Sequence, residues 1–163
     1  PILRVVFGPR DPSYISPILS AIQSDLCESG IDGVLSTHIQ RDALEKFSYV
    51  SPIGAAGVYL RAVAGDFQKE GPARELFKSM IREISALAAA MGYPFEKDYV
   101  KINLEILSNL SADATTSMQR DIMEGKPSEL DGLVMEPLRL AKKYSVSMPC
   151  YEEVANVLCP LEF

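Results

Sequence analysis

The sequence predicts an all-α fold of several helices, preceded by one short strand. Two observations support this fold class: apolar residues recur at helical spacing along most of the chain, and only residues 1–8 form a short β-branched segment closed by a glycine. The length of 163 residues is typical of one domain, because a domain usually contains about 100 to 200 residues.

The expected strand covers residues 1–8, and the turn Gly8-Pro9-Arg10-Asp11-Pro12 ends it. A single strand is not stable in water, because its backbone N–H and C=O groups need a neighbouring strand. We therefore expect residues 1–12 to be the end of a preceding domain and its linker, with the rest of the sheet in that domain, and residues 13–163 to form the helical domain. The alternative is a two-stranded ribbon within this chain, with residues 33–37 as the second strand.

Helices are expected over residues 16–30, from residue 38 onward, and over residues 73–91, 96–110, 117–124, 128–141 and 151–158. Pro17 occupies the tolerated first turn of the first helix, whereas Pro52 and Gly54 lie inside the second and are expected to bend or interrupt it. The segment 73–91 has the clearest apolar stripe, which predicts core positions for Ala73, Leu76, Phe77, Met80, Ile81, Ile84, Leu87, Ala88 and Met91.

Composition excludes several classes of protein. A formal net charge of -6 opposes nucleic-acid binding, which needs a surplus of Lys and Arg. No apolar run approaches the roughly 18 residues of a membrane-spanning helix, so no membrane partner is expected. Cys27, Cys150 and Cys159 lack the spacing of a disulfide framework or a zinc site. We expect reduced cysteines, no metal and a cytoplasmic protein.

A polar run, residues 116–131, separates the apolar helices. Ser117 is expected to begin the short helix and Ser128 to cap the next one, with Asp131 completing a capping box. Glu129 then lies in the first turn, where the helix dipole stabilises a carboxylate by about 0.3–1 kcal/mol. Helix N-termini readily hold anions and hydrogen-bonding ligands, so Ser117 and Glu129 are candidate binding residues. Caps and turns alone are the alternative interpretation.

Lys46 is the candidate proton donor. Helical periodicity places it near the face shared with Ala43 and Val50, which predicts partial burial and, beside a carboxylate, an ammonium group that can give up a proton. A surface lysine with its stem on the protein is the alternative. His38, the only histidine, is expected to be a polar residue at a helix start.

The polar run and its surroundings resemble the C-terminal helical domain of ketopantoate reductases (2-dehydropantoate 2-reductases), which is of the 6-phosphogluconate-dehydrogenase-like type. The resemblance covers nearly the whole chain and is most specific between Ser117 and Glu129. The residues that carry it are Val5-Val6-Phe7-Gly8-Pro9, Leu44-Glu45-Lys46-Phe47, Glu83 with Gly92, Ser117-Met118, Asp121-Ile122, Gly125, Glu129, Asp131 and Val146-Ser147-Met148-Pro149.

The resemblance implies a role for each candidate residue. Lys46 would act as the general acid toward the keto oxygen, Ser117 would bind the substrate near its carboxylate, and Glu129 would line the cleft beside the substrate and the nicotinamide ribose. Glu83 would support the site. Two asparagines that bind substrate in the family are replaced here by Val50 and Gly54. We expect either that Ser48 and Ser51 substitute for them, or that the substrate is a less polar 2-oxo acid.

The resemblance also implies the function. We expect the substrate-binding and dimerisation domain of an NADPH-dependent 2-oxo-acid reductase, similar to the enzyme that converts ketopantoate to pantoate in pantothenate and coenzyme A biosynthesis. NADP would be bound mainly by an N-terminal nucleotide-binding domain, because no GxGxxG follows a strand in this chain, so the chain alone would be inactive. A homodimer is expected. The alternatives are a noncatalytic helical dimerisation module, a reductase of another 2-oxo acid, or a 3-hydroxyacid dehydrogenase helical domain.

Overall fold

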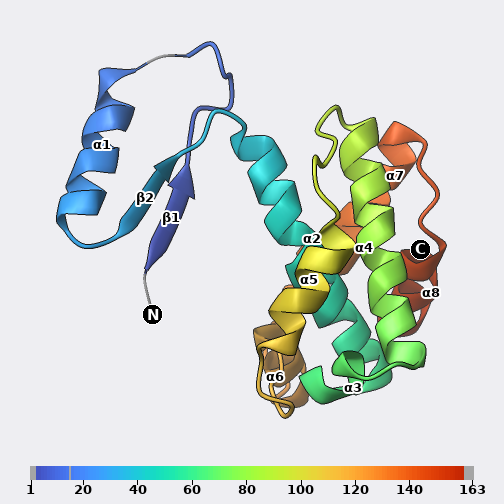
Figure 1. The fold of residues 1–163 in the computed structure, drawn as a ribbon. Helices are drawn as coiled ribbons and strands as arrows, with labels where there is room; N and C mark the ends of the chain where they lie inside the picture. Colours follow the sequence, from blue (N-terminus) through green and yellow to red (C-terminus); the bar gives the residue numbers. More distant parts are fainter. Residues whose placement is uncertain (1–2, 15, 160–163) are drawn as a thin grey trace. The chain divides into compact units, whose positions relative to one another are not determined.

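The structure is a computed structural model that describes residues 3–14 and 16–159, and it divides into two compact units, Pro1–Ala43 and Leu44–Phe163 (Figure 1). The sequence placed a boundary between residues 12 and 13, whereas the compact units meet between residues 43 and 44. The assignment of the first residues to the end of another domain stays a prediction.

The first unit is a strand, a helix and a second strand: β1 (Arg4–Phe7), α1 (Pro17–Glu28) and β2 (Asp32–Leu35). The strands are parallel, with Val5 opposite Gly33. Parallel strands need a crossover of about a dozen residues or more, and α1 provides it. The sheet has both strands in this chain, so the alternative of a two-stranded ribbon is confirmed and the expectation that β1 has no partner here is wrong.

The second unit is helical. Its elements are α3 (Ala64–Gln68), α4 (Pro72–Ala90), α5 (Tyr99–Ser108), α6 (Ser117–Met123), the π-helix η1 (Asp131–Met135), α7 (Glu136–Tyr144), α8 (Pro149–Leu158) and most of α2 (Ile39–Leu60). The all-α prediction is confirmed for this unit. Among the described residues, no helix is long and apolar enough to cross a membrane.

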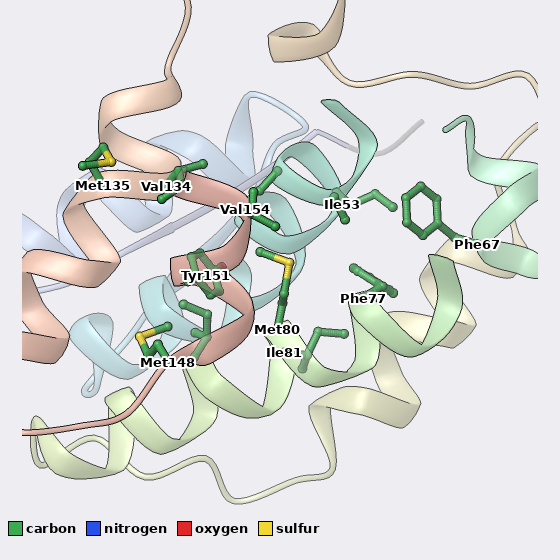
Figure 2. Close-up of a cluster of buried hydrophobic side chains, with 14 of the residues drawn as sticks. Ile53, Phe67, Phe77, Met80, Ile81, Val134, Met135, Met148, Tyr151 and Val154 are labelled. Carbon is green, nitrogen blue, oxygen red and sulfur yellow. The ribbon is translucent and has the colours of Figure 1, made fainter. Parts of the chain in front are cut away.

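The helix α4 organises the core, because it lies against α3, α5, α7 and α8 (Figure 1). The predicted stripe is confirmed at its centre, where Phe77, Met80, Ile81 and Ile84 have no exposed surface. Figure 2 shows the side chain of Met80 reaching toward Tyr151 and Val154 of α8. Burial of each such side chain stabilises the fold by about 1.5–3 kcal/mol relative to exposure.

The helix α2 is continuous through Pro52, so the predicted interruption is wrong. A proline inside a helix has no N–H for the carbonyl four residues earlier, here that of Ser48. The amide Nδ2 of Asn103 donates to this carbonyl at 3.0 Å and to Ser48 Oγ at 3.1 Å. The side chain of Asn103 in α5 thus replaces the missing helical bond, and α2 continues.

A second proline creates the same requirement in the helical run η1–α7. Pro137 follows Leu133 by four residues and cannot donate to its carbonyl. Ser51 Oγ donates to that carbonyl at 2.6 Å and lies 2.5 Å from Tyr151 Oη. Since the single hydroxyl proton of Ser51 goes to Leu133, the Tyr151 hydroxyl donates to Ser51. A buried polar network therefore joins α2, η1 and α8.

Residues 51–57 of α2 are buried, and most of them are small. Small residues let neighbouring elements approach closely: a Cβ on Gly54 would lie 3.1 Å from Met118 Cε, and one on Gly57 would lie 2.7 Å from Gln119 Cδ. The Gln119 side chain cannot move away freely, because its Nε2 donates to the Ala62 carbonyl at 2.8 Å and its Oε1 accepts from Thr116 N at 2.9 Å.

We predict that Gly57→Ala lowers the free energy of unfolding by about 1–3 kcal/mol, because the added methyl group displaces the hydrogen-bonded Gln119 amide. Urea denaturation monitored by circular dichroism would measure the loss. Gly132→Ala is the matched control, since a Cβ there meets nothing within 4 Å. Equal stability of the two variants would contradict the close packing of α2 against α6.

Candidate active site

Lys46 lies on α2, and its side chain is exposed. Among the residues that the structure describes, none forms a hydrogen bond or ion pair with its ammonium group. The expected partial burial is therefore wrong, and no carboxylate within the described second unit neutralises the charge. An exposed, unpaired ammonium is available to an incoming anionic or carbonyl ligand.

Ser117 is the first residue of α6, and Thr116, not Ser117, is its N-cap. Thr116 Oγ1 accepts from Gln119 N at 3.2 Å, while Gln119 Oε1 accepts from Thr116 N at 2.9 Å. This reciprocal pair is a capping box. Because Thr116 satisfies the helix end, the exposed hydroxyl of Ser117 is left for another partner.

Glu129 is exposed just before η1, and its carbonyl accepts from Leu133 N at 2.9 Å. The predicted capping box of Ser128 and Asp131 is wrong, because the Asp131 carboxylate pairs with Arg139. This ion pair lowers the pKa of Asp131. The carboxylate of Glu129 has no hydrogen-bond partner within the described part of the chain.

One segment of α2 lies close to the elements that carry all three candidates. Ideal Cβ positions place Gly54 beside Met118 and Thr116 of the α6 start, and 3.9 Å from Leu133 Cδ1 of η1. Lys46 is two turns earlier on the same helix. The start of α6, which carries Ser117, and η1, which follows Glu129, thus meet α2 at Gly54, whereas Lys46 lies two turns away on α2. A single site formed by these three residues stays a prediction.

Beside this segment is a pocket of about 190 Å³ formed by α2, α3, α6 and the loop before α6. Its walls include Tyr49, Ile53, Phe67, Leu110, Thr116 and Gln119. Tyr49 follows Lys46 by three residues, which places both on the same side of α2, and Thr116 directly precedes Ser117. Lys46 and Ser117 themselves are not among the residues that line the pocket.

Ser48 and Ser51, the expected substitutes for the missing asparagines, have no exposed surface. Ser48 Oγ donates to the Glu45 carbonyl at 2.7 Å and accepts from Asn103, and Ser51 bonds to Leu133 and Tyr151. A hydroxyl with no surface and with its donor and acceptor capacity used inside the protein is not positioned to bind substrate. Both serines serve the packing of α2 instead.

Glu83, the expected supporting residue, caps a helix. Its Oε1 accepts from Cys150 N at 2.8 Å and its Oε2 from Tyr151 N at 3.1 Å. These are free N–H groups in the first turn of α8, where a carboxylate also interacts favourably with the helix dipole. Glu83 therefore joins α4 to α8. Its negative charge adds to burial in raising the pKa of the Cys150 thiol to about 11.

Sequence reasoning missed Tyr49 and Asn103. The signal for Asn103 was Pro52, since a proline inside a helix predicts a freed carbonyl that needs a donor, although it does not identify the donor. Tyr49 gave no signal, because an aromatic residue on a helix usually indicates core packing. No cluster of three or more potential metal-ligating side chains occurs among residues 3–14 and 16–159.

Comparison with known proteins identifies the family of the chain. The family model described as the C-terminal domain of ketopantoate reductase PanE/ApbA matches residues 38–162. Among curated proteins, the uncharacterized oxidoreductase YkpB of Bacillus subtilis (strain 168) is 22% identical over 151 residues, covering 93% of this chain and 50% of that protein.

Several solved structures share the fold. The 2-dehydropantoate 2-reductase of Methylococcus capsulatus has a TM-score of 0.85 at 24% identity, over 98% of this chain and 50% of that one. A dimeric ketopantoate reductase from Staphylococcus aureus has a TM-score of 0.80 at 19% identity, over 95% of this chain and 52% of that one. The structure of D-mandelate dehydrogenase with NADH and anilino(oxo)acetate has a TM-score of 0.80 at 16% identity, over 94% of this chain and 64% of that one.

The fold is that of the helical domain found in these solved structures. The chain belongs to the ketopantoate reductase family, through the C-terminal domain that the family model describes. It spans about half the length of the first relatives that it matches.

We predict that Ser51→Ala lowers the free energy of unfolding by about 1–3 kcal/mol, because it leaves the Leu133 carbonyl and the Tyr151 hydroxyl unpaired in the core. Tyr151→Phe is the matched control: it removes one hydroxyl, keeps the Ser51 bond to Leu133, and is expected to cost about 1 kcal/mol or less. Chemical denaturation of both variants would rank them. A larger loss for Tyr151→Phe would contradict the assigned direction of these bonds.

We predict that Cys150 reacts slowly with iodoacetamide at pH 8, because a pKa of about 11 leaves about one thiol in a thousand ionised at that pH. Its rate should increase up to about pH 11, and mass spectrometry of the labelled peptides would identify the site. Cys27, which is exposed, is the internal control and should react first. Preferential labelling of Cys150 at pH 8 would refute the assigned environment.

Proposed function

We propose that this chain is the substrate-binding and dimerisation domain of an NADP-dependent 2-oxo-acid reductase resembling ketopantoate reductase. The observation that carries the proposal is that Lys46 and Ser117 are both exposed and without a hydrogen-bond or ion-pair partner among the described residues, on the helices α2 and α6, which lie side by side at Gly54 and Met118. Membership of the ketopantoate reductase family supports the reaction class.

The chemistry of the side chains suits this reaction. Hydride addition to a ketone puts negative charge on its oxygen, so an ammonium aimed there stabilises the transition state and supplies a proton. Lys46 is that group in our proposal, and the Ser117 hydroxyl binds the substrate carboxylate. Both functions need side chains that have no protein partner in the absence of substrate. Neither Lys46 nor Ser117 has a side-chain partner among the described residues.

The nicotinamide cofactor supplies the hydride when it is bound. The exposed Glu129 carboxylate fits a role beside the cofactor ribose, because a free carboxylate accepts hydrogen bonds from ribose hydroxyls. This sequence has no GxGxxG after a strand, so the pyrophosphate is assigned to an N-terminal nucleotide-binding domain. The exposed valines of β1, Val5 at 40% and Val6 at 41%, support a larger sheet around the first unit.

The homodimer is also part of the proposal. The family relative from Staphylococcus aureus is described as dimeric, and this chain exposes Met123 at 82% and Val157 at 58%, both on helices of the second unit. A cytoplasmic location is supported by the three cysteines, which are all free. Ketopantoate, the substrate that gives the family its name, is the first substrate to test.

A second candidate substrate class is a 2-oxo acid with an apolar side chain. Val50 and Gly54 stand where the family has asparagines, which removes two hydrogen-bonding side chains from the substrate side. D-mandelate dehydrogenase, whose structure contains anilino(oxo)acetate, has the same helical fold. The rival class of function is a noncatalytic dimerisation module, which the exposed and unpaired state of Lys46 disfavours.

We predict that Lys46→Ala lowers kcat by at least about 10²-fold in the complete protein that contains this chain, because the developing alkoxide loses its proton donor. NADPH consumption with a panel of 2-oxo acids would measure it. Lys101→Ala, which removes an exposed lysine from α5, is the matched control and should leave the rate unchanged.

Unchanged turnover of the Lys46→Ala protein would remove Lys46 from the mechanism. A wild-type protein that consumes no NADPH with any 2-oxo acid of the panel would instead support the dimerisation module.

A further inference from the structure

The turn of α2 that carries Lys46 presents a side chain that no protein group holds in place. Lys46 is exposed, and among the described residues none bonds to its ammonium group. The place of that group before substrate binds therefore depends on the backbone from which the side chain extends. A residue that fixes the backbone of this turn also fixes where the ammonium group is presented.

Pro52 weakens α2 just after this turn. It cannot donate to the Ser48 carbonyl, and a proline inside a helix is a usual site of a kink. From Ser51 onward α2 is buried, and Ser51 Oγ ties it to η1 by donating to the Leu133 carbonyl at 2.6 Å. The turn of Lys46 lies on the other side of the missing helical bond, so it needs a support of its own.

Asn103 supports the Lys46 side of this break from α5, which lies against α2 (Figure 1). Its Nδ2 donates to the Ser48 carbonyl at 3.0 Å and to Ser48 Oγ at 3.1 Å. Ser48 Oγ in turn donates to the Glu45 carbonyl at 2.7 Å. Since Lys46 lies between Glu45 and Ser48 in the chain, these bonds hold the backbone on both sides of it.

The same bonds fix the orientation of the Asn103 amide. The Ser48 carbonyl has no proton, and the Ser48 hydroxyl gives its own proton to Glu45, so both groups can only accept. Asn103 must therefore direct its NH₂ group, which has two protons, to both of them. Asn103 is 1% exposed and Ser48 has no exposed surface, so water does not compete for these bonds. The amide is a rigid support for the turn.

We propose that Asn103 is a positioning residue for the reductase reaction: it bridges the break at Pro52 and thereby fixes the turn that presents the Lys46 ammonium to the keto oxygen. The inference rests on the proposed function, in which Lys46 is the general acid. A catalytic group misplaced by about 1 Å can lose about 10²-fold in rate. Asn103 therefore affects kcat through the backbone of α2, from a buried position in α5.

The test measures kcat of the complete protein with NADPH and the 2-oxo acid that it reduces fastest. Asn103→Ala should lower kcat roughly tenfold and leave the KM for NADPH unchanged, because it displaces the turn of Lys46. In a Lys46→Ala protein the same change should lower kcat by less than about twofold, since the group that Asn103 positions is already gone. Asn109→Ala is the matched control: its amide donates to the Glu105 carbonyl at 2.8 Å within α5, and its loss should leave kcat unchanged.

Restoring the helical bond should compensate for the loss of the amide. Pro52→Ala gives α2 its own N–H for the Ser48 carbonyl, so the addition of Asn103→Ala to Pro52→Ala should change kcat by less than about twofold. This pair of proteins also decides the inference if Asn103→Ala alone does not fold. A further tenfold loss in the double variant would overturn the inference.

The outcomes separate the inference from the proposed function. Circular dichroism at the assay temperature would establish that each variant is folded. A folded Asn103→Ala protein with the wild-type kcat, or an equal loss with and without Lys46, would overturn the inference while the proposed function stands. Unchanged turnover of Lys46→Ala, or no reduction of any 2-oxo acid by the wild-type protein, would overturn both.

Discussion

Two helix-internal prolines impose the constraint on which the second unit depends. Pro52 and Pro137 each remove one helical N–H, and they free the carbonyls of Ser48, which is buried, and of Leu133, which is partly buried. The structure satisfies both from neighbouring helices, through the Asn103 amide and the Ser51 hydroxyl. Because an unpaired buried carbonyl would cost about 1–3 kcal/mol, these bonds fix how α2, α5, η1 and α8 fit together.

The same segment of α2 supports the site. Ser48 and Ser51 are part of the buried network. Lys46 carries the exposed ammonium group, and Tyr49 lines the pocket. The helix can hold a free ammonium group at a defined place because its other side is held by Asn103, Leu133 and Tyr151. Rigid support of this kind is what a positioned acid requires, since small displacements of a catalytic group lower the rate strongly.

Periodicity predicted the helical core, because burial along α4 follows the 3.6-residue repeat, and motif resemblance proposed Lys46, Ser117 and Glu129 as candidates. The exposure of Lys46 could not be predicted, since the small residues of α2 are buried on every side and blur the apolar face. The pairing of Ser48 with Asn103 joins residues far apart in the chain, so the freed carbonyl was predictable but its donor was not. The strand β2 was ambiguous because it is four residues long and includes Gly33.

The central claim is that α2 and α6 hold a 2-oxo acid between Lys46 and Ser117. A crystal structure of the complete protein with NADP and a 2-oxo acid would test it most directly. The account predicts substrate oxygens within about 3.2 Å of Lys46 Nζ and Ser117 Oγ. A ligand bound elsewhere, with the Lys46 ammonium still free, would contradict it.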